Sequence, residues 1–135
     1  MGILWSMSEV AVPTLLVIDD DVGARMLFQT ALEAAGYRVL IAESGQHSLN
    51  LLSHCTVDVI LANSLMREKD GLELIPRLRA AQPTSKIIAL SGGAGGQGNP
   101  DSAKPSGADY FLKKPHSLFA LLDAISAQLK KVVRK

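Results

Sequence analysis

The stretch PTLLVIDDD, residues 13–21, decides the fold of this chain. Residues 15–18 form an unbroken run of large apolar side chains, which is typical of a β-strand that is buried on both faces. Asp19, Asp20 and Asp21 follow directly and end that run. The stretch therefore predicts a strand inside a sheet, with a cluster of acidic side chains at its carboxyl end.

Four more segments have the composition of buried strands. They are YRVLIA (37–42), VDVILA (57–62), KIIALSG (86–92) and DYFLKKP (109–115). Helical patterns separate the first four strands, and a crossover helix returns the chain to the same end of a sheet, so neighbouring strands pair in parallel. The predicted fold class is α/β, a single domain built on a doubly wound, five-stranded parallel sheet.

The helices are expected at 21–35, 45–54, 71–81 and after residue 117, where Ser117 can cap the last one. Gly36 is expected to end the first helix, and Pro76 suits only the first turn of the third. Apolar residues recur at helical or near-helical spacing in the first and last helices. They are Val22, Met26, Leu27, Leu32 and Ala35 in the first, and Leu118, Leu121, Leu122, Ile125 and Leu129 in the last.

Polar residues stand at the carboxyl ends of the expected strands, where a doubly wound sheet binds its ligands. The residues expected to converge there are Asp19, Asp20, Asp21, Asn63, Ser91, Lys113 and Lys114. Adjacent acids repel one another unless a cation lies among them, and Mg²⁺ binds through one or two carboxylates and takes phosphate oxygens as further ligands. A hydroxyl and a lysine suit the remaining phosphoryl oxygens. The set predicts a site for a magnesium ion and a phosphoryl group.

This set, together with LLVIDDD at 15–21 and GADYFLKKP at 107–115, resembles the receiver domain of two-component response regulators over residues 14–131. The resemblance implies a flavodoxin-like (βα)5 fold with strand order 2-1-3-4-5. It also implies that Asp19 and Asp20 bind Mg²⁺. The implied phosphoryl and switch contacts are Ser91, Lys114 and Phe111, with a cis-proline at Pro115.

An amide occupies the position of the family's phosphoacceptor aspartate. In receivers that aspartate lies five residues after the acid that opens the third strand and eight before a glycine preceded by Asp. Both counts, from Asp58 and from Gly71, lead to Asn63. The amide nitrogen is delocalised into its carbonyl, so Asn63 cannot form an acyl phosphate, and the lost charge weakens Mg²⁺ binding. The family usually has proline four residues further on, where this chain has Arg67.

We therefore expect a stand-alone receiver domain in two-component (phosphorelay) signalling, with no fused output domain. It would be a pseudo-receiver that acts by protein–protein interaction and is not an enzyme. Its expected partner is a histidine kinase or another signalling protein, bound through the surface of residues 100–125. Residues 1–13 are expected to be a disordered leader and residues 132–135 a basic tail.

Two alternatives stay open. The first is a conventional phosphorylatable receiver, with an acid restored by deamidation of Asn63 or supplied by Asp19 or Asp20. The second is a small-ligand or nucleotide-binding flavodoxin-like domain, because residues 93–98 contain G-x-G-x-x-G. Against nucleotide binding, Asn99 and Pro100 follow the glycines, where a dinucleotide site needs a helix to begin.

Composition argues against several other classes. A chain of 135 residues with 47% hydrophobic and 20% charged residues suits one soluble globular domain. The net charge of +1 gives no basic footprint for nucleic acid. Glu9 and Pro13 break the apolar run near the start, so no membrane span is expected. The single Cys55 excludes an internal disulfide and fits the cytoplasm, and the three histidines and this thiol lack metal-ligand spacing.

Overall fold

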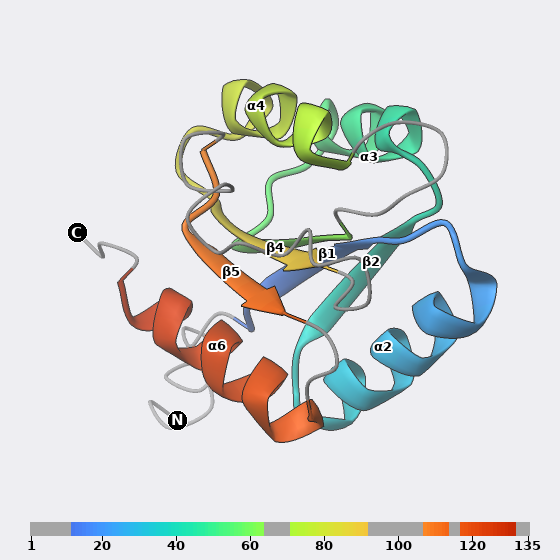
Figure 1. The fold of residues 1–135 in the computed structure, drawn as a ribbon, viewed down its shortest axis with the longest axis vertical. Helices are drawn as coiled ribbons and strands as arrows, with labels where there is room; N and C mark the ends of the chain where they lie inside the picture. Colours follow the sequence, from blue (N-terminus) through green and yellow to red (C-terminus); the bar gives the residue numbers. More distant parts are fainter. Residues whose placement is uncertain (1–11, 64–70, 92–106, 114–116, 132–135) are drawn as a thin grey trace, which may run out of the picture.

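Five parallel strands form one sheet in the structure, as the alternation of apolar and helical segments predicts. The structure, a computed structural model, describes residues 12–63, 71–91, 107–113 and 117–131. The strand order is β2-β1-β3-β4-β5 (Figure 1), which confirms the order implied by the family resemblance. The strands are β1 (Thr14–Ile18), β2 (Arg38–Ala42), β3 (Val59–Asn63), β4 (Lys86–Ser91) and β5 (Tyr110–Lys113).

Helices cover both faces of the sheet. They are α2 (Val22–Ala34), α3 (Gly45–Leu52), α4 (Gly71–Ala81) and α6 (Leu118–Lys130). Figure 1 shows α3 and α4 on one face and α2 and α6 on the other, which is the doubly wound arrangement. The glycine-rich segment at 92–106, most of the expected leader and the basic tail lie outside the described residues.

The central strand β1 divides its side chains between two hydrophobic cores. Leu16 and Ile18 pack into the core under α3 and α4, whereas Leu15 and Val17 pack into the core under α2 and α6. All four side chains are no more than 1% exposed. Burial on both faces, predicted from the unbroken apolar run, is therefore confirmed.

The helix predicted at 21–35 is present, but its apolar residues do not form one buried face. Leu32 is fully buried and Phe28 packs beside it. Val22, Met26 and Leu27 are 60%, 62% and 69% exposed. Because an α-helix completes a turn in 3.6 residues, positions 28 and 32 share one face and the other three lie to its side. The exposed side chains of Val22, Met26 and Leu27 thus face away from the sheet.

The predicted position of Pro76 is wrong. Pro76 is the sixth residue of α4 and not in its first turn; burial of Leu74, Ile75 and Leu78 around it holds the helix together despite the missing N–H donor. In α6, the buried stripe begins only at Leu121, and Leu118 is 47% exposed. None of the helices in the described ranges has the length and hydropathy needed to cross a membrane.

Candidate functional site

The register of the sheet brings the predicted polar residues to one edge. Ile18 of β1 pairs with Ala62 of β3, so Asp19 and Asn63 are the next residues along two neighbouring strands. Asn63 in turn pairs with Leu90 of β4. Ser91 ends β4 and pairs with Lys113, the last residue of β5. The edge therefore presents, across four strands, an acid, an amide, a serine and a lysine.

Asp19 is held firmly at this edge. It is 2% exposed, and its backbone N–H donates to the carbonyl oxygen of Ala42 at 3.1 Å. Its Oδ1 atom accepts a hydrogen bond from the backbone N–H of Asp21 at 2.9 Å. The contact orients the carboxylate through the first residues of the following turn, so the acid is positioned before any ligand arrives.

The two acids after Asp19 have different surroundings. Asp21 is exposed and caps α2, since its Oδ2 atom accepts from the backbone N–H of Ala24 at 2.7 Å. A carboxylate is a favoured N-cap and also complements the helix dipole. Asp20 is half-buried and lies between the cap and Asp19. Asp21 therefore has a structural task, and Asp19 and Asp20 remain the acids that are predicted to bind a cation.

Asn63 is a buried polar side chain at the end of β3, with 7% of its surface exposed. Phe111 is 8% exposed and packs in the core under α3 and α4. Lys113 is exposed. The side chain of Ser91, the predicted Lys114 contact and the predicted cis-proline at Pro115 lie outside the described residues, so their roles stay predictions.

The donor set suits a magnesium ion. The carboxylate of Asp19 is buried at this end of the sheet, where its Oδ1 atom accepts a hydrogen bond from the backbone N–H of Asp21. No group of three or more His, Cys, Asp or Glu side chains that could share a metal occurs in the described ranges. A cation bound by Asp19 and Asp20 would complete its shell with water, the arrangement typical of Mg²⁺.

Arg25 is a further residue of this edge that the sequence reasoning missed. Its Nη1 atom donates to the backbone carbonyl oxygen of Asp19 at 2.8 Å. Helical side chains lean toward the N-terminus of their helix, so an arginine in the first turn of α2 can reach back to the strand end. The guanidinium places a fixed positive charge beside the acids. The sequence feature that could have identified Arg25 is its position six residues after Asp19.

Comparisons of sequence agree with this geometry. Residues 15–126 match the family model described as the response regulator receiver domain. The response regulator receiver protein CpdR of Brucella abortus is 34% identical over 115 residues, which make up 85% of this chain and 95% of CpdR. The transcriptional regulatory protein GlrR of Escherichia coli is 34% identical over 116 residues, but this chain spans 26% of its length.

Solved structures agree as well. The receiver domain of the Francisella response regulator 1452 has a TM-score of 0.80 and 29% identity, with 90% of this chain and 99% of that chain covered. A CheY-like response regulator receiver domain protein from Methanospirillum hungatei has a TM-score of 0.82 and 25% identity, with 90% and 96% covered.

Proposed function

Because this chain belongs to the response regulator receiver domain family, we propose that it is a pseudo-receiver, which binds another signalling protein and is not switched by phosphorylation of residue 63. Receiver domains are signalling domains of two-component systems and in general not enzymes. We propose that this chain is likewise a signalling domain and not an enzyme. It would lie in the cytoplasm and make no contact with nucleic acid.

The observation that carries the proposal is the amide at the end of β3. Asn63 is buried next to the strand end that carries Asp19. Transfer of a phosphoryl group to a receiver requires a carboxylate oxygen as the nucleophile. The nitrogen lone pair of Asn63 is delocalised into its carbonyl, and the carbonyl oxygen carries no full charge, so neither atom can form a stable phosphoryl bond.

Magnesium belongs to the proposal in a weakened form. Asp19 and Asp20 would hold the ion, which when bound offsets negative charge at this edge. An amide at position 63 supplies one negative charge fewer than a carboxylate, and Mg²⁺ affinity depends on the charge of its oxygen ligands. Arg25 already contributes a positive charge beside Asp19, which further reduces the attraction for a second cation.

Exposed apolar side chains support action through a protein partner. Within residues 100–125, the described part exposes Tyr110 by 41%, Leu118 by 47% and Phe119 by 78%. On α2, Met26 and Leu27 are more than 60% exposed. Grouped apolar side chains on a protein surface often mark interaction sites. We place the contact with a histidine kinase or related signalling protein on the surface of residues 100–125, with the exposed side of α2 as a second candidate.

Intact-mass spectrometry after incubation with Mg²⁺ and acetyl phosphate tests the proposal. The protein and the variant Asn63→Asp are compared. The proposal expects no mass gain for the protein itself and a gain of about 80 Da, one phosphoryl group, for the variant. A gain in the unmodified protein would support a conventional receiver with another acceptor acid. If neither gains mass, more of the pocket than residue 63 has changed.

A further inference from the structure

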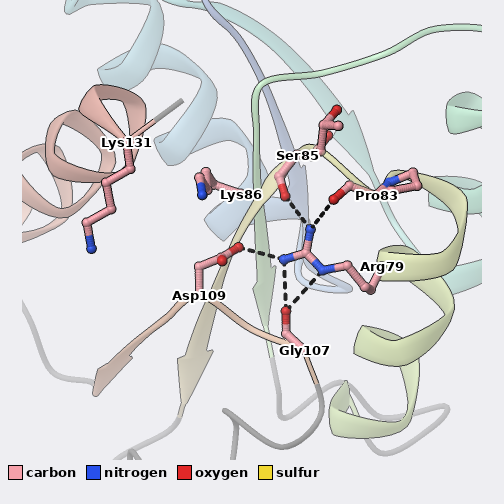
Figure 2. A pocket seen from close by; sticks show the side chains of 8 residues that line it. Arg79, Pro83, Ser85, Lys86, Gly107, Asp109 and Lys131 are labelled. Atoms are coloured by element: carbon pink, nitrogen blue, oxygen red, sulfur yellow. Dashed lines mark hydrogen bonds and ion pairs between the residues drawn. The ribbon is translucent and has the colours of Figure 1, made fainter. Parts of the chain in front are cut away.

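A pocket lies at the edge of the sheet opposite to Asp19 and Asn63. It has a volume of about 460 Å³ and surrounds the beginning of β4 and the residues before β5. Figure 2 shows residues of several elements around it, with Arg79 extending from α4 toward Gly107 and Asp109, and Lys131 lying to their side at the end of α6. Its lining includes Arg79, Thr84, Lys86, Gly107, Asp109 and Lys131.

Arg79 forms a rigid part of the wall, because all five of its N–H donors are engaged (Figure 2). Nε and Nη2 donate to the carbonyl oxygen of Gly107 at 3.3 and 2.9 Å. Nη1 donates to the carbonyl oxygens of Pro83 and Ser85 at 3.1 and 2.6 Å. Nη2 also donates to Oδ2 of Asp109 at 2.6 Å. A guanidinium has five donors, so none remains for a ligand.

The carboxylate of Asp109 is also engaged by groups of the pocket wall. Its Oδ2 atom accepts from Arg79 and also from the backbone N–H of Ile87 at 2.8 Å. Arg79 and Asp109 therefore neutralise each other in the one ion pair found among the described residues. The ammonium groups of Lys86 and Lys131 have no hydrogen-bond or ion-pair partner in the described part of the chain. The pocket is left with an excess of two positive charges.

We propose that this pocket binds a small phosphoryl-bearing anion, with Lys86 and Lys131 as its charged contacts and the Thr84 hydroxyl as a further donor. Two ammonium groups match the charge of a phosphate monoester, and hydrogen bonds between charged groups are the strong ones. The volume is in the range that holds small molecules. The described lining contains no aromatic side chain on which a nucleobase could stack, so the expected ligand class is a non-aromatic phosphate ester or free phosphate.

The pocket is distinct from the acid-bearing edge. Lys86 begins β4 and Ser91 ends it, which separates the two edges by roughly 16 Å at the usual rise of a strand. The charges are also opposite. Asp19 and Asp20 repel an anion unless a cation accompanies it, whereas the lysines attract one directly. Binding at the pocket therefore needs no Mg²⁺, and this separates it experimentally from any receiver chemistry.

Calorimetric titration of the whole chain with glycerol phosphate, in EDTA and at constant ionic strength set with sodium chloride, tests the proposal. We expect saturable binding that Lys86→Gln and Lys131→Gln each weaken about tenfold, the loss of one hydrogen bond to a charged group. Lys130→Gln is the matched control, since Lys130 neighbours Lys131 but does not line the pocket, and it should change the affinity less than about twofold.

A second titration with inorganic phosphate distinguishes the two sources of the anion. Tighter binding of glycerol phosphate indicates an ester, and equal or tighter binding of inorganic phosphate indicates free phosphate; either supports the pocket if Lys86→Gln weakens it. Absence of saturable binding to the unmodified protein overturns the proposal. So does equal weakening by all three lysine variants, which would indicate unspecific charge attraction. Thermal unfolding of each variant verifies that the fold is retained.

Discussion

Asp19 and Asn63 are direct neighbours across the sheet, each one residue beyond a paired residue of β1 or β3. Their side chains are 2% and 7% exposed. Two carboxylates so placed would repel each other in a poorly hydrated environment. The amide at position 63 removes that repulsion, so this edge of the sheet can form without a cation.

Asn63→Asp is therefore expected to make the unfolding free energy depend on magnesium. Without Mg²⁺ the variant should lose about 1–2 kcal/mol of unfolding free energy, because a second buried charge faces Asp19. Added Mg²⁺ should recover most of that loss and stabilise the variant more than the unmodified protein. Urea unfolding with EDTA and with Mg²⁺ measures both effects. Equal Mg²⁺ responses of the two proteins would contradict the expected weakening by the amide.

Two leucines of α2 provide a matched test of which side of the helix is buried. Leu32→Ala should lower the unfolding free energy by about 3 kcal/mol, because it leaves a cavity in a packed core. Leu27→Ala should change it by less than about 0.5 kcal/mol, because that side chain is largely in solvent. Chemical denaturation of both variants measures these changes in unfolding free energy. A large effect at Leu27 would mean that its exposed surface is covered in solution.

Arg79→Met should lower the unfolding free energy by about 2–4 kcal/mol. The substitution leaves the carbonyl oxygens of Gly107, Pro83 and Ser85 without their donor and leaves the partly buried Asp109 carboxylate without its cation. Arg77→Met, on the exposed side of the same helix, is the control and should have little effect. Arg79→Lys should recover only part of the loss, since an ammonium lacks the planar set of five donors.

Gln128 is a site where a substitution should stabilise the protein. It is 2% exposed in the stripe of Leu121, Ala124 and Ile125, and its Oε1 atom has no hydrogen-bond partner among the described residues. Gln128→Met keeps the shape and removes this buried acceptor, which should raise the unfolding free energy by about 1 kcal/mol. Gln46→Met, at an exposed position of α3, controls for the change in hydrophobicity. A lower stability of Gln128→Met would reveal a hydrogen bond or water contact at this amide.

Local sequence pattern predicts the strands of this fold well, for a physical reason. A strand buried on both faces consists of consecutive apolar residues, and the acids or amides that end it mark where the chain reaches solvent. β1 and β3 accordingly lie within one or two residues of their predicted bounds. Gly36 also ends α2 as expected, with a φ of 102° that suits glycine. The strand order came from the resemblance to receivers, because pairing between distant segments leaves no local trace.

The features that the sequence did not predict depend on contacts between distant segments. The acceptors of Arg79 in Gly107 and Asp109 lie 28 and 30 residues away along the chain, and no periodicity connects them. The exposed Val22 and Met26 show a second limit of prediction from the sequence. Apolar residues at helical spacing identify a helix with an apolar face, but the neighbouring elements determine whether Phe28 and Leu32 or the other apolar residues meet the sheet.

The position of β1 between β2 and β3 has a consequence for biosynthesis. The three strands made first, within residues 14–63, are adjacent in the finished sheet, and β4 and β5 then extend it from one side in chain order. Domains begin to fold from their N-terminal part during translation. The nascent chain can thus assemble the neighbouring Asp19 and Asn63 strand ends before β4 and β5 leave the ribosome, and the opposite pocket, which needs α4, β4, β5 and α6, is completed last.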